Sequence, residues 1–270
     1  MLIPTAVESY LATLRTTRRP TTVSRASQIL RGFVSSFPDR RLNELQSSDV
    51  MSYVKALPHS NRTKANHHIR IVAMLRHHGI TIKAECPRFV EPIPQTYNAG
   101  DLARFFAACE IRQLAYFKTL LMCGLRMQES KYLEWSDVSN GMLHVRAKPR
   151  YGFLPKTWEE RRIPVAPVLV SLLHQMPRRP GTMIFPTASG LPDRHLLRHC
   201  KRIANRAGLD ETKWSLHGFR RTFCTTCLRA GLDVRTVMQL MGHKDIESTL
   251  RYWRPVEMEQ LRGKMGTIFQ

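Results

Sequence analysis

Leu216-His217-Gly218-Phe219-Arg220 is the most informative stretch of this 270-residue sequence, because a histidine and an arginine stand three positions apart at the predicted start of a helix. Side chains with that spacing share one face of a helix. Leu240-Met241-Gly242-His243 follows, with Thr249-Leu250-Arg251-Tyr252 close behind it. Upstream lie Cys123-Gly124-Leu125-Arg126-Met127-Gln128-Glu129 and then Pro155-Lys156-Thr157, ahead of Arg162-Ile163-Pro164-Val165. Each segment alone is weak evidence for a particular function, but the presence of all of them in this order is strong evidence.

Together these segments resemble the tyrosine recombinases, the phage-integrase family of site-specific DNA recombinases. The family's G-L-R-x-x-E, H-x-x-R and G-H-x(8)-Y boxes occur here in the correct order, over roughly Asn98 to Leu261. The resemblance implies a fold that is mainly α with a small antiparallel β-sheet, in which a helical core-binding domain precedes an integrase-type catalytic domain. The chain departs from the pattern at Arg221, where many relatives carry histidine.

The chemistry of such enzymes explains their residue types. Displacing a DNA oxygen from a phosphodiester builds charge on the non-bridging oxygens, which guanidinium groups can grip. The resemblance gives that role to Arg126 and Arg220, and the attack to the phenol of Tyr252. It gives His217 a role in proton transfer near the nucleophile, and His243 a hydrogen bond to the phosphate. The product would be a 3′-phosphotyrosine link with a free 5′ hydroxyl. This link conserves the energy of the broken bond, so rejoining needs no ATP, and the resemblance implies no cofactor or metal.

The departing 5′ oxygen needs a proton, which in this family comes from a lysine on a β-hairpin. Lys148 and Lys156 both lie between the predicted strands Met142–Arg146 and Arg161–Val165. Lys156 matches the family's lysine, which stands a few residues before an arginine and an Ile-Pro step. We therefore predict Lys156 as the general acid, with Lys148 as the alternative.

Several of these residues also have a purely structural interpretation. Gly242-His243 fits a helix C-cap, and Tyr252 beside Trp253 fits an aromatic pair in a core. Glu129, one helical turn after Arg126, is expected to orient that arginine by an ion pair. The six cysteines are scattered, and we expect reduced thiols, with the C-x-x-C at Cys224 to Cys227 forming small buried groups rather than a metal or redox site.

The pattern of apolar residues predicts helices only up to about Ile82. We expect Ser48 to cap a helix over Asp49–Leu57, Ser60 or Asn61 to open the next helix, and Asn98 to cap a helix that starts near Asp101. Residues 83–97 contain three prolines and no periodicity, which is typical of a linker. We therefore predict a helical core-binding domain over residues 1–82, a linker over 83–97 and a catalytic domain over 98–270.

The charge of the chain points to DNA. Its 42 lysines and arginines against 21 acidic residues give a net charge of +21, an excess that favours a polyanionic partner. The candidate DNA contacts lie on two predicted basic helices: Arg62, Lys64, Arg70, Arg194, Arg198, Lys201 and Arg202. We expect Asp193 to cap the second of these helices and Leu197 to lie on its buried face.

The partners that the resemblance implies are double-stranded DNA recombination sites and other copies of the chain in a tetramer, with accessory DNA-bending proteins as further candidates. The segment Val256 to Met265 is expected either to dock onto a neighbouring subunit or to fold back on its own domain. Without an apolar run near 18 residues or a secretory signal, we expect a cytoplasmic, nucleoid-associated protein.

Three other functions are compatible with parts of this pattern. A DNA-binding protein on the same fold could have lost catalysis, although all the expected polar groups are present. A type IB topoisomerase-like enzyme would use the same chemistry to relax supercoils, but the chain length and the G-L-R-x-x-E box favour a recombinase. A basic structural nucleoid protein would satisfy the charge alone. Integration, excision, inversion and dimer resolution all fit the predicted chemistry.

Overall fold

The computed structural model describes residues 1–268, except for the side chains of residues 254, 255, 259, 260, 263, 264, 266 and 267. The chain divides into two compact units, Met1–Pro92 and Ile93–Gln270. Between Ile80 and Asn98, a fully described stretch, the backbone forms neither helix nor strand. Among the described residues, no helix is both long and apolar enough to cross a membrane.

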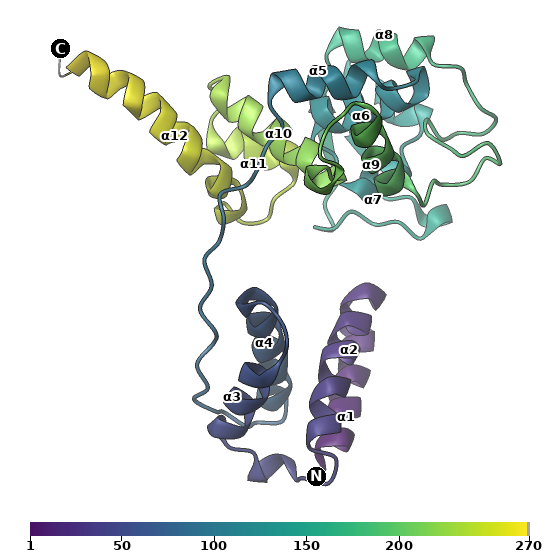
Figure 1. Ribbon diagram of the computed structural model, residues 1–270. Coiled ribbons are helices and arrows are strands. Elements are labelled where there is room, and N and C mark those ends of the chain that lie inside the picture. Colours follow the sequence, from purple (N-terminus) through teal and green to yellow (C-terminus); the bar gives the residue numbers. More distant parts are fainter. Residues whose placement is uncertain (269–270) are drawn as a thin grey trace. The chain divides into compact units, whose positions relative to one another are not determined.

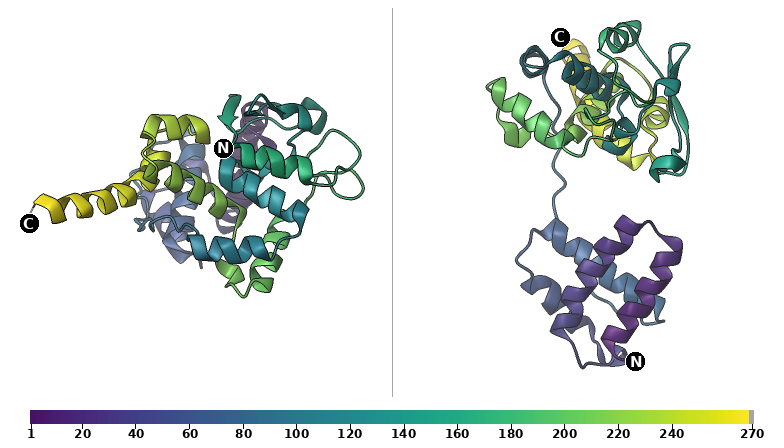
Figure 2. Two further views of the ribbon diagram at one scale, coloured as in Figure 1. Left: turned by 90° about the horizontal axis from the view of Figure 1, so that it is seen from above. Right: turned by 90° about the vertical axis from the view of Figure 1, so that its right-hand side faces the viewer.

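The first unit is a bundle of helices around its own core. It consists of α1 (Ile3–Thr17), α2 (Pro20–Ser36), the short 3-10 helix η1 (Leu42–Glu44), α3 (Ser47–Ala56) and α4 (Asn61–His77). The views in Figure 2 show α1 and α2 lying side by side. Leu11, Leu30, Phe33 and Leu75 have no exposed surface, and burial of each such side chain contributes roughly 1.5–3 kcal/mol.

Local capping explains where two of these helices begin. Ser60 caps α4 as predicted, because its hydroxyl accepts a hydrogen bond from the backbone N–H of Thr63. The prediction that Ser48 caps α3 is wrong. The helix begins at Ser47, two residues earlier than a cap at Ser48 would place it, after Gln46, whose backbone N–H donates to the carboxylate of Asp49 at 2.8 Å.

The second unit is mainly helical with one small sheet, which confirms the predicted fold class (Figure 1). Its helices are α5 (Ala99–Ala107), α6 (Ile111–Cys123), α7 (Met127–Lys131), α8 (Pro167–Gln175), α9 (Leu196–Arg206), α10 (Leu216–Arg229), α11 (Val234–Met241) and α12 (Glu247–Ile268), with the 3-10 turns η2 (Trp135–Asp137), η3 (Pro149–Tyr151) and η4 (Glu211–Lys213).

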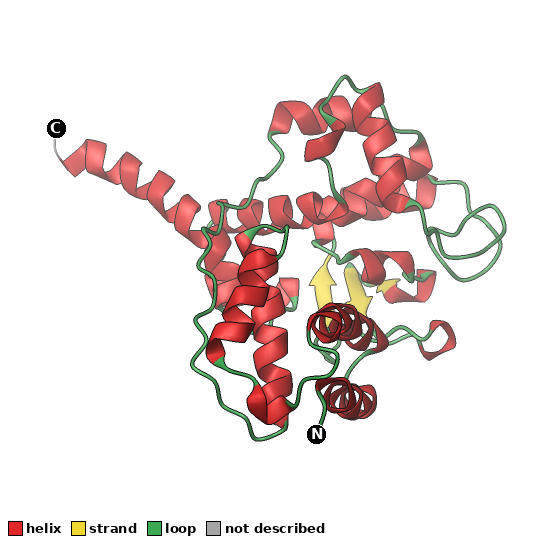
Figure 3. Cartoon of the chain, turned by 60° about the horizontal axis from the view of Figure 1, so that its bottom comes forward, coloured by secondary structure: helices red, strands yellow, loops and turns green. Residues whose placement is uncertain are grey.

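The described strands form one antiparallel sheet in the order β1-β2-β3 (Figure 3). Strands β2 (Met142–Val145) and β3 (Arg161–Pro164) are the predicted hairpin, and Leu143 pairs with Ile163 where both side chains face the core. The two-residue β1 (Val138–Ser139) was not predicted, because so short a segment has no alternation to detect. The hairpin therefore supports a long loop over residues 146–160.

Aromatic rings hold the core of the second unit together. Trp214 stacks between Tyr97 and Phe105, with ring centroids 4.0 and 4.3 Å apart. All six cysteines are free, and Cys224 is buried as expected while Cys227 is half-buried. Two expectations for α9 are wrong. Its N-cap is His195 rather than Asp193, whose carboxylate accepts a hydrogen bond from the backbone N–H of His195. Leu197 is 44% exposed and not buried.

Helix α12 begins in the core and ends outside it. Its first turns pack on α10 and α11, where Tyr252 and Val256 are buried with Phe223 and Met241. The later turns extend beyond the other helices of the unit (Figure 1). Of the segment predicted to dock, Val256 folds onto its own unit, while its described apolar side chains Met258, Leu261 and Met265 are exposed. The side chains of its residues 259, 260, 263 and 264 lie outside those described.

Candidate active site

Arg126 stands at the junction between two helices of the second unit. Gly124 ends α6 in the left-handed conformation, with φ of +58°, and a Cβ there would collide with the ring of Phe223. The chain then turns, and Arg126 becomes the N-cap of α7. As predicted, Glu129 orients it: Nη1 and the backbone N–H of Arg126 each donate to one carboxylate oxygen of Glu129, both at 2.8 Å.

Arg220 lies deeper, on the first turns of α10. Its guanidinium donates to the carbonyl oxygen of Gly124 at 2.6 Å and to that of Met241 at 2.5 Å. Arg126 also donates to a carbonyl from the same turn, that of Gly242, at 2.6 Å. The structure therefore joins the two predicted arginines, 94 positions apart in sequence (220 minus 126), through one helix end.

The two arginines differ in exposure. The side chain of Arg126 is 19% exposed, whereas Arg220 is only 1% exposed. Burial, and then the charge of Arg126, lowers the pKa of Arg220 to about 9, so the group is still charged at neutral pH. Contact between Arg220 and a phosphate would require its neighbours to move.

Both predicted histidines lie in this positive environment. Desolvation and then the charges of Arg220 and Arg221 lower the pKa of His217 to about 4. Burial and then the charges of Arg220 and Arg126 lower the pKa of His243 to about 3. Each histidine is therefore neutral near pH 7. His217, although partly desolvated by its neighbours, keeps an exposed surface at which it can accept a proton.

Local contacts fix His243. Gly242 ends α11 in the left-handed conformation, as the C-cap interpretation predicts, and His243 follows it. The Nδ1 atom of His243 forms a 2.8 Å hydrogen bond with the hydroxyl of Thr249, which is fully buried. The start of α12 therefore sets the orientation of the imidazole.

Tyr252 lies on α12, is 9% exposed and belongs to the apolar cluster that α12 forms with α10 and α11. Burial raises its pKa above the ordinary value of 10, an effect that the charges of Arg221 and Arg220 oppose. The phenol is therefore protonated at neutral pH and close enough to Arg220 to respond to its charge.

The two candidate lysines have different environments. Lys148 is buried, and its ammonium donates to Glu134 at 2.9 Å and to Asp137 at 2.6 Å. Lys156 is exposed, and its charge contributes to the lowered pKa of His217, so it lies in the same neighbourhood. Because Lys148 is held in a buried ion pair, this geometry favours Lys156 as the proton donor.

The predicted DNA contacts fall into two groups. On α9 and just before it, Arg194, Arg198 and Arg202 are exposed and line a shallow hollow together with Lys201. On α4, two of the candidates already have partners. Arg62 lies 3.7 Å from Glu91 and against the ring of Phe89, and Lys64 donates to the carbonyl of Lys55 at 2.7 Å; Arg70 is half-buried.

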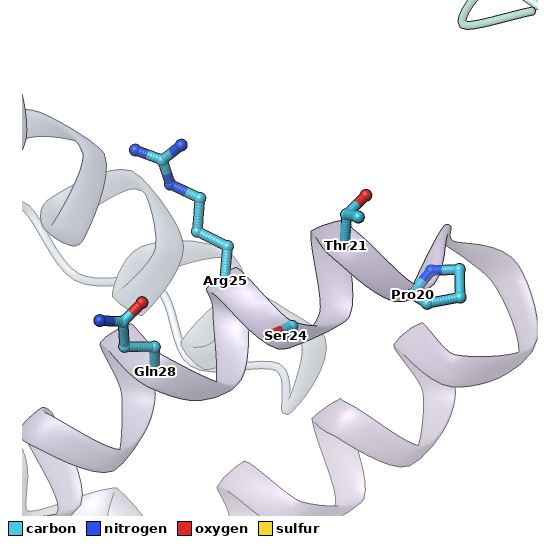
Figure 4. Close-up of a pocket in the computed structure, with 5 residues that line it drawn as sticks. All are labelled: Pro20, Thr21, Ser24, Arg25 and Gln28. Carbon is cyan, nitrogen blue, oxygen red and sulfur yellow. The ribbon is translucent and has the colours of Figure 1, made fainter. Parts of the chain in front are cut away.

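A face of α2 was not among the predicted DNA contacts. Thr21, Ser24, Arg25 and Gln28 project from the same side of the helix, next to Pro20 at its start, and line a hollow of about 560 Å³ (Figure 4). Its signal in the sequence is a set of polar residues at positions i, i+3, i+4 and i+7, with no acidic residue in α2. Charge alone does not reveal this face, because most of its side chains are neutral hydrogen-bonding groups.

A mainly helical unit that brings two arginines, two histidines, a hairpin lysine and a partly buried tyrosine into one neighbourhood has the tyrosine-recombinase architecture. The chain belongs to the phage integrase family, whose model matches residues 96–258.

Relatives agree with this assignment. The chain is 27% identical over 191 residues to tyrosine recombinase XerD of Pseudomonas putida, covering 64% of this chain and 61% of the relative. It is 32% identical over 195 residues to XerD of Proteus mirabilis, covering 65% and 59%. The chain therefore spans about three-fifths of the length of these curated relatives.

Solved structures share the fold. A Tn1549 transposon integrase in complex with transposon right end DNA superimposes with a TM-score of 0.79 at 17% identity, covering 97% of this chain and all of that one. A lambda integrase tetramer bound to a Holliday junction matches with a TM-score of 0.74 at 14% identity, covering 93% and 77%.

Proposed function

We propose that this chain is a site-specific DNA recombinase that cuts and rejoins strands through a 3′-phosphotyrosine link to Tyr252. The observation that carries the proposal is the anchoring of Arg126 and Arg220 to one helix end, beside His243 and within electrostatic reach of Tyr252. Family membership supports the same activity.

In this mechanism the arginines stabilise the charge that develops on the phosphate. Once the neighbours that bury Arg220 have moved, guanidiniums that are already fixed by the end of α11 need little further reorganisation as the charge grows. His243, neutral and oriented by Thr249, donates a hydrogen bond without adding charge. His217 accepts the proton of Tyr252, whose raised pKa makes a base necessary. Lys156 donates a proton to the departing 5′ oxygen.

The resting site is closed. Arg220 is 1% exposed and Tyr252 is 9% exposed, so a phosphate cannot meet both without a rearrangement. We infer that DNA binding shifts the start of α12, because that segment carries Tyr252, buries it against α10 and α11, and also holds His243 through Thr249.

Both units would bind DNA. We assign residues 1–82 to a core-binding domain, 83–97 to a linker and 98–270 to the catalytic domain. In the catalytic domain, the basic hollow along α9 suits phosphate contacts. In the core-binding domain, the face of α2 carries Arg, Gln, Ser and Thr, the residue types that hydrogen-bond to base edges (Figure 4).

Assembly on DNA would use other copies of the chain. The exposed residues Met258, Leu261, Met265 and Ile268 recur every three to four positions along α12, so they form an apolar stripe. We infer that this stripe docks on a neighbouring subunit in a tetramer. If the chain acts on DNA in this way, accessory DNA-bending proteins are further candidate partners, and its place in the cell is the nucleoid in the cytoplasm.

Covalent capture tests the activity on DNA of random sequence, so the recombination site need not be identified beforehand. The chain is incubated with nicked duplexes of random sequence, in which the short strand released by cleavage diffuses away and leaves the protein trapped. Trapped duplexes are then sequenced, and the tryptic peptide that spans residues 252–262 is examined for a nucleotide on Tyr252. We expect a defined sequence and a modified Tyr252.

Tyr252→Phe is the matched control, because it removes only the nucleophilic oxygen. We expect this variant to bind the captured duplex as wild type does and to form no adduct. Trapping by Tyr252→Phe would refute the assignment. Efficient relaxation of any supercoiled plasmid, without exchange between two captured sites, would instead favour the topoisomerase-like alternative.

A further inference from the structure

The C-terminal end of α11 binds three arginines, and only two of them belong to the proposed phosphate clamp. The carbonyls of Met241 and Gly242 accept from Arg220 and Arg126, and the carbonyl of Leu240 accepts from Nε of Arg161 at 2.8 Å. The last carbonyls of a helix lack partners within it and carry partial negative charge, so cations collect there.

Arg161 also binds the residue that orients Arg126. Its Nη1 and Nη2 atoms donate to the two carboxylate oxygens of Glu129, at 3.0 and 2.7 Å. Such a paired arrangement fixes direction as well as distance. The Glu129 side chain is 2% exposed and that of Arg161 is 9% exposed, so water competes little for either group.

The contacts of Arg161 direct its guanidinium at the protein. All three nitrogen atoms of its guanidinium already donate hydrogen bonds, to Leu240 and Glu129. Gly242 packs directly on this guanidinium, because a Cβ there would lie 3.0 Å from Nη1. With a side chain only 9% exposed, Arg161 is placed to act on the reaction through its neighbours.

Arg161 also starts β3 and so ends the loop that carries Lys156, five positions earlier. The other arm of the loop is fixed separately, by the ion pairs of Lys148 with Glu134 and Asp137. One buried side chain thus connects the loop, Glu129 and the end of α11.

We propose that Arg161 is a positioning residue for DNA cleavage: by holding Glu129 and the last carbonyls of α11, it sets the place of Arg126 and anchors the hairpin arm that carries Lys156. This inference rests on the proposed function. It adds a residue that touches neither DNA nor the nucleophile.

The test compares Arg161→Ala with Arg162→Ala, which removes the same charge from the exposed neighbouring position of β3. The rate of adduct formation is measured at saturating concentration of the duplex captured by wild type, and the dissociation constant is measured separately. We expect Arg161→Ala to slow cleavage about 10²-fold with little change in binding, since small displacements of catalytic groups have effects of this size. Arg162→Ala should cleave within about threefold of wild type, as exposed positions usually tolerate change.

Chemical rescue separates positioning from a folding defect. Guanidinium chloride at low millimolar concentration should restore part of the rate of Arg161→Ala, because the free ion can occupy the space beside Glu129, whereas sodium chloride at the same concentration should not. If Arg161→Ala does not fold, Arg161→Lys replaces it. Lysine keeps the charge but cannot form the paired contact, so we expect a loss of about tenfold.

The outcomes are distinct. Cleavage by folded Arg161→Ala at the wild-type rate would overturn the inference, as would a loss explained wholly by weaker DNA binding or one that guanidinium does not relieve. If Arg161→Lys is the variant used, the wild-type rate overturns it equally. Absence of any adduct with the wild-type chain would overturn the proposed function, and this inference with it.

Discussion

Arg126 and Arg220 are held by carbonyls at the end of α11, whereas Lys156 lies exposed on the loop between β2 and β3. The two regions carry the same sign of charge but suit different tasks. Groups that stabilise a developing charge work best when they are already in place. A proton donor must instead reach an oxygen whose position depends on the bound DNA. The comparison indicates that the proposed site is rigid at the arginines that would hold phosphate and open at the lysine that would protonate the leaving group.

The largest expected effect lies in the rigid region. Arg220→Lys should slow cleavage about 10³-fold, because a lysine cannot reproduce the planar fork that binds phosphate. It should also lower the free energy of unfolding by about 1–3 kcal/mol, because a carbonyl at Gly124 or Met241 loses its partner. Single-turnover adduct formation and urea denaturation measure the two effects. Unchanged stability would contradict the rigid anchoring.

In the open region, activity and stability should separate. Lys156→Ala should slow cleavage about 10²-fold through loss of a general acid, yet leave the free energy of unfolding unchanged, since the side chain is exposed. A DNA substrate with a 5′ thiol as leaving group needs no proton and should restore the rate. Failure of this rescue would remove Lys156 from the mechanism.

Lys148→Met provides the opposite test within the same hairpin. Removal of Lys148 takes away the ammonium that Glu134 and Asp137 share, but leaves Glu134 paired with Arg150 and Asp137 paired with Arg146, so the free energy of unfolding should fall by about 1–3 kcal/mol. At a temperature where the variant is folded, cleavage should be near normal. If the 5′ thiol substrate rescues this variant rather than Lys156→Ala, the two lysines exchange roles.

Acid should weaken the rigid region first. The pKa values of His217 and His243, about 4 and about 3, lie below the ordinary value of 6.5, so the unfolded chain binds protons that the folded chain does not. The free energy of unfolding should therefore fall as pH decreases from 6.5 toward 4. Below 4.5, protonation of Glu129 adds to the loss, because Arg161 and then Arg126, against the effect of burial, lower its pKa to about 2.

Denaturation at a series of pH values measures this fall. His217→Asn combined with His243→Asn should flatten the curve between pH 6.5 and 4.5. His174→Asn, at an exposed position on α8, is the matched control and should leave the slope unchanged. An unaltered slope in the double variant would mean that the arginines do not control these histidines.

The smallest effect concerns the first unit. Arg25→Ala should weaken binding to the captured duplex by about 1–3 kcal/mol and relax its preference at one base pair. Arg62→Ala should have less effect, because Arg62 already contacts Glu91 and Phe89. Competition binding with base-substituted duplexes measures both. Equal losses would show that α4 contributes as much as α2.

Much of the fold could be predicted from sequence. Helix ends marked by Ser60, Asn98 and Gly242 were found because capping depends on residues adjacent in the chain. The residues of the candidate site came from ordered motifs. The shared anchoring of Arg126 and Arg220 could not be predicted, since the carbonyls that accept from them are the same in every residue type.

The role of Arg161 was missed for a related reason. In sequence it is one of two adjacent arginines before an Ile-Pro step, and nothing local distinguishes it from Arg162. Only the alternation of a strand decides which of the two is buried, and a shift of one residue would exchange them. The choice of Lys156 over Lys148 could rest only on a motif, because the contacts of Lys148 with Glu134 and Asp137 cannot be read from the sequence.

The burial of Tyr252 and Arg220 has a consequence for fidelity. A chain with a net charge of +21 adheres to phosphates of any sequence, so adhesion alone discriminates poorly between a correct site and the rest of a genome. If uncovering the nucleophile consumes part of the free energy of binding, a mismatched duplex is penalised twice, once in occupancy and once in the fraction of bound complexes that are competent to react. Stray encounters would then end in dissociation rather than in a broken strand.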